Sequence, residues 1–81
     1  MLVESEQISD WLRRRINTAR AESGMSWGQI AEMLSTPKVT VSPGSLMSKH
    51  SRASFTAVEL VAILRVMGVS EVRLPEPQHP T

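Results

Sequence analysis

The stretch Met25-Ser26-Trp27-Gly28-Gln29-Ile30 decides the fold, because it marks the start of a helix. Ser26 can accept a hydrogen bond from a backbone amide of the first turn, and Gln29 can bond back to the amide of Ser26. The apolar residues at the two ends of the stretch can pack on each other as a hydrophobic staple. This combination predicts a helix from about residue 27 to residue 34 or 35, with core positions at Ile30, Ala31 and Leu34.

The same signature occurs twice more along the chain. Thr56 is a second cap, with Glu59 three residues later, and it predicts a helix over residues 57–67 that stops at Gly68. Ser42 is a third cap, followed by Pro43 at the first helical position but by no Glu or Gln at the third. It predicts a helix from about residue 43 to residue 50 or 51.

A longer helix precedes these three. Apolar residues recur at helical spacing from about Glu6 to Ser23, and Gly24 is suited to end the helix. Asp10 and Arg14 are four residues apart and can form an ion pair. The buried stripe is expected to consist of Ile8, Leu12, Ile16 and Ala19.

These elements predict an all-α fold, a compact bundle of four to five short helices that contains a helix-turn-helix. We expect a single domain over residues 1–74 and a flexible tail over 75–81, which is rich in proline. The helix over 57–67 is apolar nearly all round, and with residues 69–74 it carries more apolar surface than an 81-residue fold can bury. A homodimer is therefore expected through this helix and residues 69–74.

Composition excludes several classes of site. The chain has no cysteine, and its two histidines are not at metal-ligand spacing from other donors. No glycine-rich phosphate loop or nucleophile motif occurs, so we expect no enzyme activity, metal or cofactor. The sequence contains no run of apolar residues long enough to predict a membrane-spanning helix. A cytoplasmic location is expected.

Charge is unevenly distributed, although the net charge is only +1. Lys38, Lys49 and Arg52 lie between Glu32 and Glu59, and no acidic residue lies among them. Such segregation can place a basic face on a nearly neutral protein. The run of arginines at 13–15 is interpreted either as a solvated face or as a phosphate-contacting one.

Individual side chains of the short helices also have expected roles. The helix near 43–51 contains few large apolar residues, which suits a helix that lies in a groove with its backbone close to a partner. Trp27 is expected to pack at the edge of the domain, and His50 to border the core. The internal methionines are expected to fill gaps in the packing, with Met47 also open to a partner: Met25, Met33, Met47 and Met67.

Three segments resemble the lambda-repressor-like (Cro/Xre-type) helix-turn-helix family. Residues 24–34 resemble its second helix, 41–46 are similar to the Val-Ser-x-x-Thr-Ile opening of its recognition helix, and 55–69 are similar to a later helix that ends in Ala-Leu-Gly-Val. The resemblance covers residues 8–70. Residues 45–53 are also similar to the pattern Asn-Leu-x-x-Lys-Ile-Ser-Arg-Gly of an uncharacterised bacterial subfamily.

The resemblance implies a small transcription regulator, a repressor that binds double-stranded DNA as a dimer and reads the major groove with the helix near 43–51. By position, Ser26 and Gln29 contact phosphates and Arg52 follows the backbone, while five residues face the groove: Ser42, Gly44, Ser45, Ser48 and Lys49. Arg13 and Lys38 are further expected DNA contacts.

The alternative is a protein-interaction module that has kept this fold and lost DNA binding. The link between the second and third helices is longer than the usual turn, and the third helix lacks the Arg, Gln or Asn that commonly read base edges. The arrangement of the basic side chains distinguishes the two hypotheses, because DNA binding favours one common surface for Arg13, Arg20, Lys38, Lys49 and Arg52.

Overall fold

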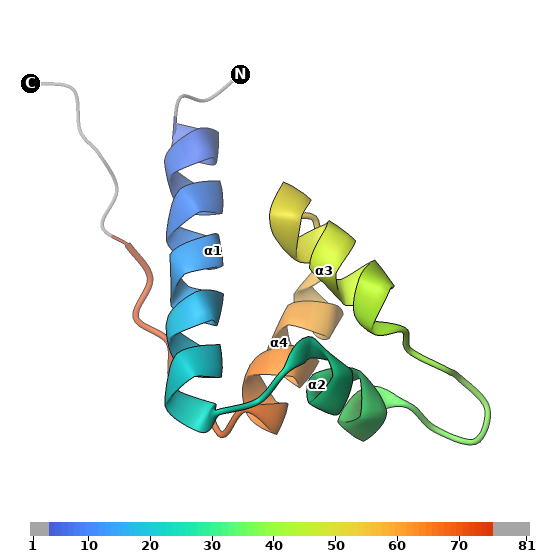
Figure 1. The fold of residues 1–81 in the computed structure, drawn as a ribbon. Coiled ribbons are helices and arrows are strands. Elements are labelled where there is room, and N and C mark those ends of the chain that lie inside the picture. Colours follow the sequence, from blue (N-terminus) through green and yellow to red (C-terminus); the bar gives the residue numbers. More distant parts are fainter. Residues whose placement is uncertain (1–3, 76–81) are drawn as a thin grey trace, which may run out of the picture.

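The computed structural model describes residues 4–75 and contains four α-helices (Figure 1). These are α1 (Glu4–Ser23), α2 (Trp27–Leu34), α3 (Pro43–Arg52) and α4 (Ala57–Val66). No strand occurs between residues 4 and 75, so the predicted all-α class is confirmed. The tail expected at 75–81 lies, apart from Pro75, outside the described residues.

The three short helices begin where their capping residues predict. At α2, Ser26 Oγ accepts from the backbone N–H of Gln29 at 3.1 Å, and Gln29 Oε1 accepts from the N–H of Ser26 at 2.8 Å. At α4, Thr56 and Glu59 form the same reciprocal pair, at 3.1 and 2.9 Å. At α3, Ser42 Oγ accepts from a backbone N–H of the first turn at 3.1 Å. All three predicted helix starts are confirmed.

Three left-handed residues reverse the chain after helices. Gly24 and Gly68 have φ values of 71° and 83°, which glycine adopts without steric cost. Ala53 ends α3 with φ 50° and ψ 43°, a conformation that costs a residue with a Cβ about 1–2 kcal/mol. This turn leads the chain from the end of α3 toward the start of α4.

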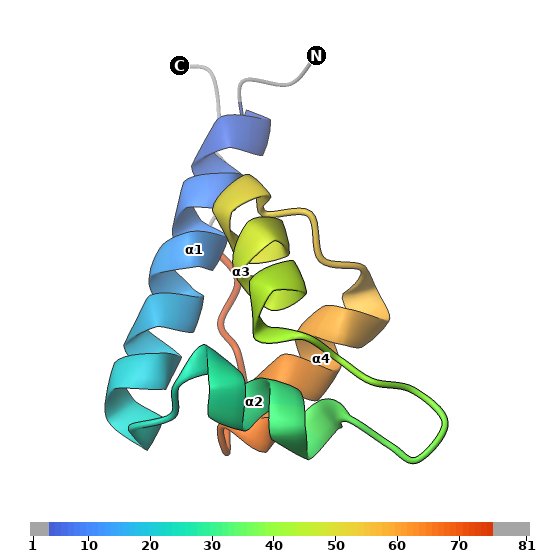
Figure 2. The same cartoon turned by 45° about the vertical axis from the view of Figure 1, so that its right-hand side comes forward.

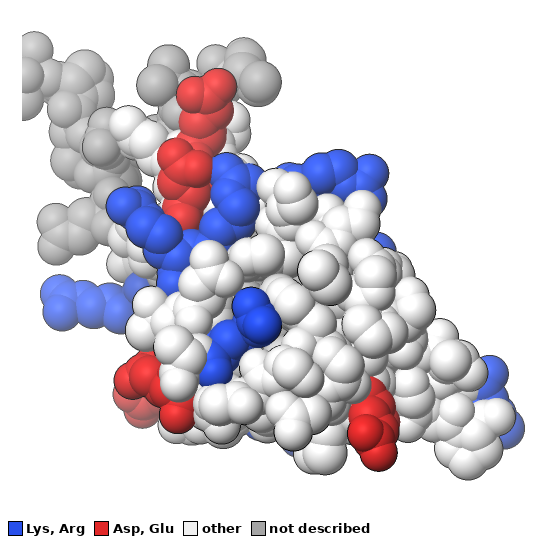
Figure 3. All heavy atoms as spheres, in the orientation of Figure 1, with Lys and Arg blue, Asp and Glu red and all other residues white. Residues whose placement is uncertain are grey.

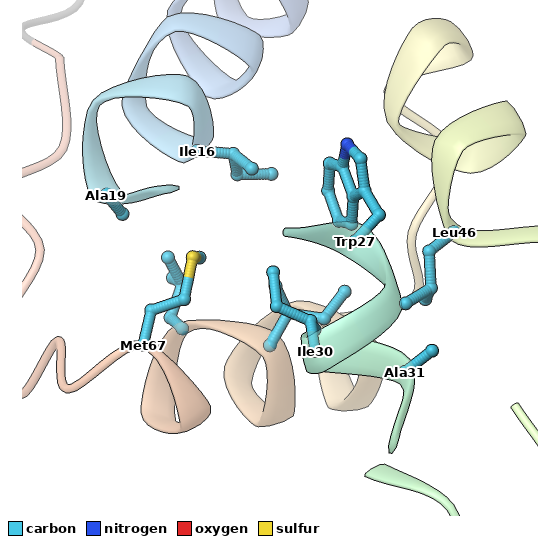
Figure 4. Close-up of a cluster of buried hydrophobic side chains, with 9 residues drawn as sticks. Ile16, Ala19, Trp27, Ile30, Ala31, Leu46 and Met67 are labelled. Carbon is cyan, nitrogen blue, oxygen red and sulfur yellow. The ribbon is translucent and has the colours of Figure 1, made fainter. Parts of the chain in front are cut away.

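The core lies where the four helices meet, and side chains from all of them converge there (Figure 4). Trp27 is 7% exposed, which confirms its expected packing role. Nine hydrophobic residues of the described part of the chain are buried: Ile16, Ala19, Trp27, Ile30, Ala31, Leu46, Ile63, Leu64 and Met67.

Two residues expected to be buried are exposed. Ile8 is 51% exposed because the first turns of α1 extend beyond the ends of α2 and α4 (Figure 2). Met33 is 65% exposed, since it lies on the outer side of the last turn of α2. The ion pair expected from Asp10 also differs, because Asp10 pairs with Arg13 at 2.7 Å and not with Arg14.

The long link between α2 and α3 forms a small loop of its own. Thr36 and Val39 exchange two backbone hydrogen bonds of 2.8 and 3.2 Å. Ser35 Oγ donates to Ala31 O at 2.8 Å and accepts from the N–H of Val41 at 2.9 Å, which ties the two ends of the loop together. The loop projects away from α1 in both ribbon views (Figures 1 and 2).

Candidate functional site

The outward face of α3 is exposed and contains no acidic residue. Leu46 is the single buried side chain of this ten-residue helix and anchors it to the core. A Cβ on Gly44 would meet no heavy atom within 4 Å, so packing does not require glycine there, and its backbone is open to a close approach. The exposed residues that face away from Leu46 are Gly44, Ser45, Met47, Ser48, Ser51 and Arg52.

The start of α2 presents hydrogen-bond donors at the surface. Ser26 and Gln29 are both exposed, and the capping box uses their side-chain oxygens as acceptors. The hydroxyl proton of Ser26 and the amide NH₂ of Gln29 remain to donate outward. An open hollow of about 480 Å³ adjoins them, and its lining includes Asn17, Arg20 and Ser26.

Arg20 and His50 contact the Trp27 ring where α1, α2 and α3 meet, and Arg13 contacts α3 nearby. The Arg20 guanidinium carbon lies 4.7 Å from the centroid of the Trp27 ring, a cation–π geometry. The ring of His50 lies 5.2 Å from Trp27, between centroids, so His50 borders the core as the sequence predicts. Arg13 Nη1 donates to the carbonyl of Ser51 in the last turn of α3, at 3.1 Å.

The environment of His50 disfavours the charged form of its ring. Burial of the ring lowers the pKa of His50 below its ordinary value of 6.5, and the charges of Arg20 and Arg13 lower it further. His50 Nδ1 and Arg20 Nε are buried without a hydrogen-bond partner. The positive charge of this junction is therefore carried by the two arginines.

Lys49 does not face outward with the serines of α3. Its ammonium forms an ion pair with Glu59 Oε2, and Glu59 is the capping-box residue of α4. The bond from Lys49, followed by that from the N–H of Thr56, lowers the pKa of the Glu59 carboxyl. The charge of Lys49 is thus partly neutralised beside α4.

The five basic side chains named in the sequence are divided between different places. Arg13 contacts the last turn of α3, which also contains Arg52, and Arg20 lies at the start of α2. Lys49 pairs with α4, and Lys38 is exposed on the loop that projects away from α1. In Figure 3, basic side chains flank α1 and the C-terminal end of α3, with acidic side chains of the first turns of α1 beside them.

Asn17 is a neighbour of the site to which the sequence assigned no DNA contact. Arg20 and Asn17 share a face of α1 with Arg13, and the structure places both beside Ser26. Asn17 lies four residues after Arg13 and Arg20 lies seven after it, so helical spacing places all three on one face. Ser42 caps α3 and is exposed at its first turn.

Neither a metal-binding cluster nor a membrane-spanning helix is found between residues 4 and 75. This part of the chain contains no group of three or more His, Asp or Glu side chains arranged to hold a metal ion. None of its helices combines the length and apolar character needed to cross a membrane.

Comparisons with known proteins identify a family for the chain. The family model described as "Domain of unknown function (DUF6471)" matches residues 8–72, which include α2, α3, α4 and most of α1. Neither the curated proteins nor the solved structures contain a significant match. The chain belongs to the DUF6471 family.

Proposed function

We propose that this domain binds double-stranded DNA as a small transcription regulator, with the outward face of α3 in the major groove. The observation that carries the proposal is that face itself, which is exposed, made mostly of small residues and without an acidic side chain. An α-helix fits the major groove, and a helix of small residues brings its backbone close to the base edges. Repression is the form of regulation favoured by the resemblance of the sequence to the lambda-repressor-like helix-turn-helix family.

α3 extends to Arg52, beyond its predicted end at residue 50 or 51, so this arginine becomes the principal candidate for reading a base or a nearby phosphate. It lies four residues after Ser48 and seven after Ser45, so the three side chains share one side of α3. Arginine can donate two parallel hydrogen bonds to guanine, while serine hydroxyls reach a base only at short range. Gly44, at the first turn, permits that short range.

Phosphate contacts are assigned to the start of α2 and to α1. Ser26 and Gln29 can donate outward there, and Arg20 lines the adjoining hollow with its charge. Backbone amides at a helix start attract anions, which supports the same position. Arg13 is oriented by Ser51 and Asp10, so it contributes a fixed charge beside the end of α3.

A protein-interaction module is the second candidate function, and the pairing of the basic groups favours it. Lys49 pairs with Glu59 and Arg13 pairs with Asp10, while the whole chain has a net charge of +1. Fewer unpaired cations release fewer counterions, so the non-specific part of any DNA affinity is small. On this hypothesis the face of α3 contacts a protein.

Direct binding measurements distinguish the two functions. The full chain is titrated into a fluorescent duplex from upstream of its own gene and into a random-sequence duplex pool, at about 50 and about 200 mM salt. DNA binding predicts a saturable anisotropy change that weakens at the higher salt, together with enrichment of a preferred sequence from the pool. Absence of binding to any duplex at the lower salt contradicts the DNA proposal and favours the protein-interaction module.

A further inference from the structure

The outer face of α4 is apolar and uncovered. Val58 is 80% exposed and Val61 is 54% exposed, although β-branched apolar side chains are usually buried. Val58, Val61 and Arg65 follow one another at spacings of three and four residues, so they form a stripe along one face of α4. The opposite face of this helix supplies Ile63 to the core.

The stripe continues into a hollow beside the end of α4. This hollow has a volume of about 550 Å³ and is open to solvent. Leu74, just after the hollow, is 73% exposed. The outer stripe of α4, the hollow and Leu74 are together called the α4 surface. The residues that line the hollow are Val61, Leu64, Arg65, Gly68, Val69, Ser70, Glu71 and Val72.

Two opposite charges lie in the hollow, and neither has an ion-pair partner among the described residues. Arg65 and Glu71 both line it and are both exposed. Neither takes part in an ion pair within residues 4–75. The surface therefore presents one unpaired cation and one unpaired anion next to exposed valines.

We propose that the α4 surface is covered by a second copy of this chain in a two-fold symmetric dimer. A two-fold axis through the hollow sets Arg65 against the partner subunit's Glu71, and the same axis sets Glu71 against the partner subunit's Arg65. A second copy supplies both opposite charges by symmetry, whereas a partner with one sign of charge leaves one group unmatched. The paired apolar surfaces bury the valines that the single chain leaves in water. This inference does not depend on DNA binding.

Sedimentation equilibrium of the full chain, from low to high micromolar concentration, tests the proposal. The wild type is expected to form a dimer, and Val61→Asp to raise the dissociation constant by about tenfold or more, because a charge is placed in an apolar contact. Met33→Asp is the matched control, since Met33 is 65% exposed on α2, outside the α4 surface. Its dissociation constant should equal that of the wild type. A wild type that stays monomeric throughout, or a Val61→Asp chain that dimerises as tightly as the wild type, overturns the proposal.

A charge exchange tests the reciprocal pairing. Arg65→Glu and Glu71→Arg each place like charges together in the dimer, so each should raise the dissociation constant. The double variant restores opposite charges and should be tighter than either single variant. Circular dichroism establishes that all three remain helical, as expected for exposed positions. A folded double variant that dimerises no more tightly than the single variants overturns the pairing of Arg65 with Glu71.

Discussion

Lys49 on α3 is joined to Glu59 on α4 by an ion pair that also involves the cap of α4. One oxygen of the Glu59 carboxylate accepts from Lys49, and the other accepts from the N–H of Thr56 at 2.9 Å. The pair links the end of α3 to the start of α4 across the turn at Ala53. The ion pair directs Lys49 toward α4, although the sequence predicts that this lysine faces the DNA groove.

Replacement of Lys49 should therefore have a small effect on stability and no effect on base preference. The two side chains are 33% and 31% exposed, so solvent screens the pair and Lys49→Ala should cost about 0–1 kcal/mol of unfolding free energy. Arg52→Ala is the comparison variant, and it should weaken DNA binding by about 1–3 kcal/mol if Arg52 reads a guanine. Urea denaturation and anisotropy titrations measure both quantities. A Lys49→Ala protein with relaxed base preference would return Lys49 to the reading face.

Removal of the α2 cap should destabilise the fold. Ser26→Ala leaves the N–H of Gln29 without its acceptor, at a cost of about 1 kcal/mol in the free energy of unfolding by urea. Ser48→Ala is the matched control, because Ser48 is exposed within α3 and alanine is a better helix former. Its stability should equal or exceed that of the wild type. Equal stability of Ser26→Ala and wild type would show that the Ser26 cap contributes nothing.

Ala53→Gly should stabilise the protein. Ala53 has a left-handed conformation, and glycine removes the steric cost at the price of a more flexible unfolded chain. The net gain should be about 0.5–1 kcal/mol. The opposite change is expected at an exposed position within α1, where Ala21→Gly should lose about 0.5–1 kcal/mol. Thermal and urea unfolding should show a higher unfolding free energy than wild type for Ala53→Gly and a lower one for Ala21→Gly. A loss of stability in Ala53→Gly would contradict the structure of this turn.

Stability should fall as the pH drops below about 6.5 because of His50. Above that pH, His50 is neutral in both folded and unfolded chains, so it contributes no pH dependence. Its pKa is lowered in the folded state, first by burial and then by Arg20 and Arg13, so the unfolded chain takes up the proton first. The stability that the neutral His50 ring contributes to the folded state is lost progressively as the pH falls from the pKa of His50 in the unfolded chain through its pKa in the folded chain.

The test compares urea unfolding of wild type and His50→Phe between about pH 7.5 and about pH 5. Phenylalanine keeps an aromatic ring beside Trp27 and has no titratable nitrogen. The variant should lose less stability than the wild type over this range. Identical slopes for the two proteins would refute the lowered pKa of His50.

The fold could be predicted because its main signals are local. Ser26, Ser42 and Thr56 lie within three residues of the amides that they cap, so a short stretch of sequence identifies each helix start. The helical spacing of Ile16 and Ala19 likewise identified the buried side of the longest helix.

The parts that could not be predicted depend on how distant elements meet. The pairing of Lys49 with Glu59 depends on the left-handed turn at Ala53, which joins the end of α3 to the segment that leads into α4. The exposure of Ile8 follows from the length of α1 relative to the rest of the bundle. The spacing of apolar residues identifies a face of the helix but not how far the other helices extend along it. For the same reason the sequence left open whether its basic side chains share one surface.

Replacement of Ser48 by glutamate tests most directly whether α3 lies in a DNA groove. Ser48 is exposed at the centre of the outward face, so Ser48→Glu places a negative charge where the account places DNA. Thr18→Glu is the control, because it changes the net charge equally at an exposed position of α1, on a different face from Arg13 and Arg20. The account predicts that Ser48→Glu weakens duplex binding at about 50 mM salt by tenfold or more, and that Thr18→Glu has a much smaller effect. Equal binding by the two folded variants would contradict it.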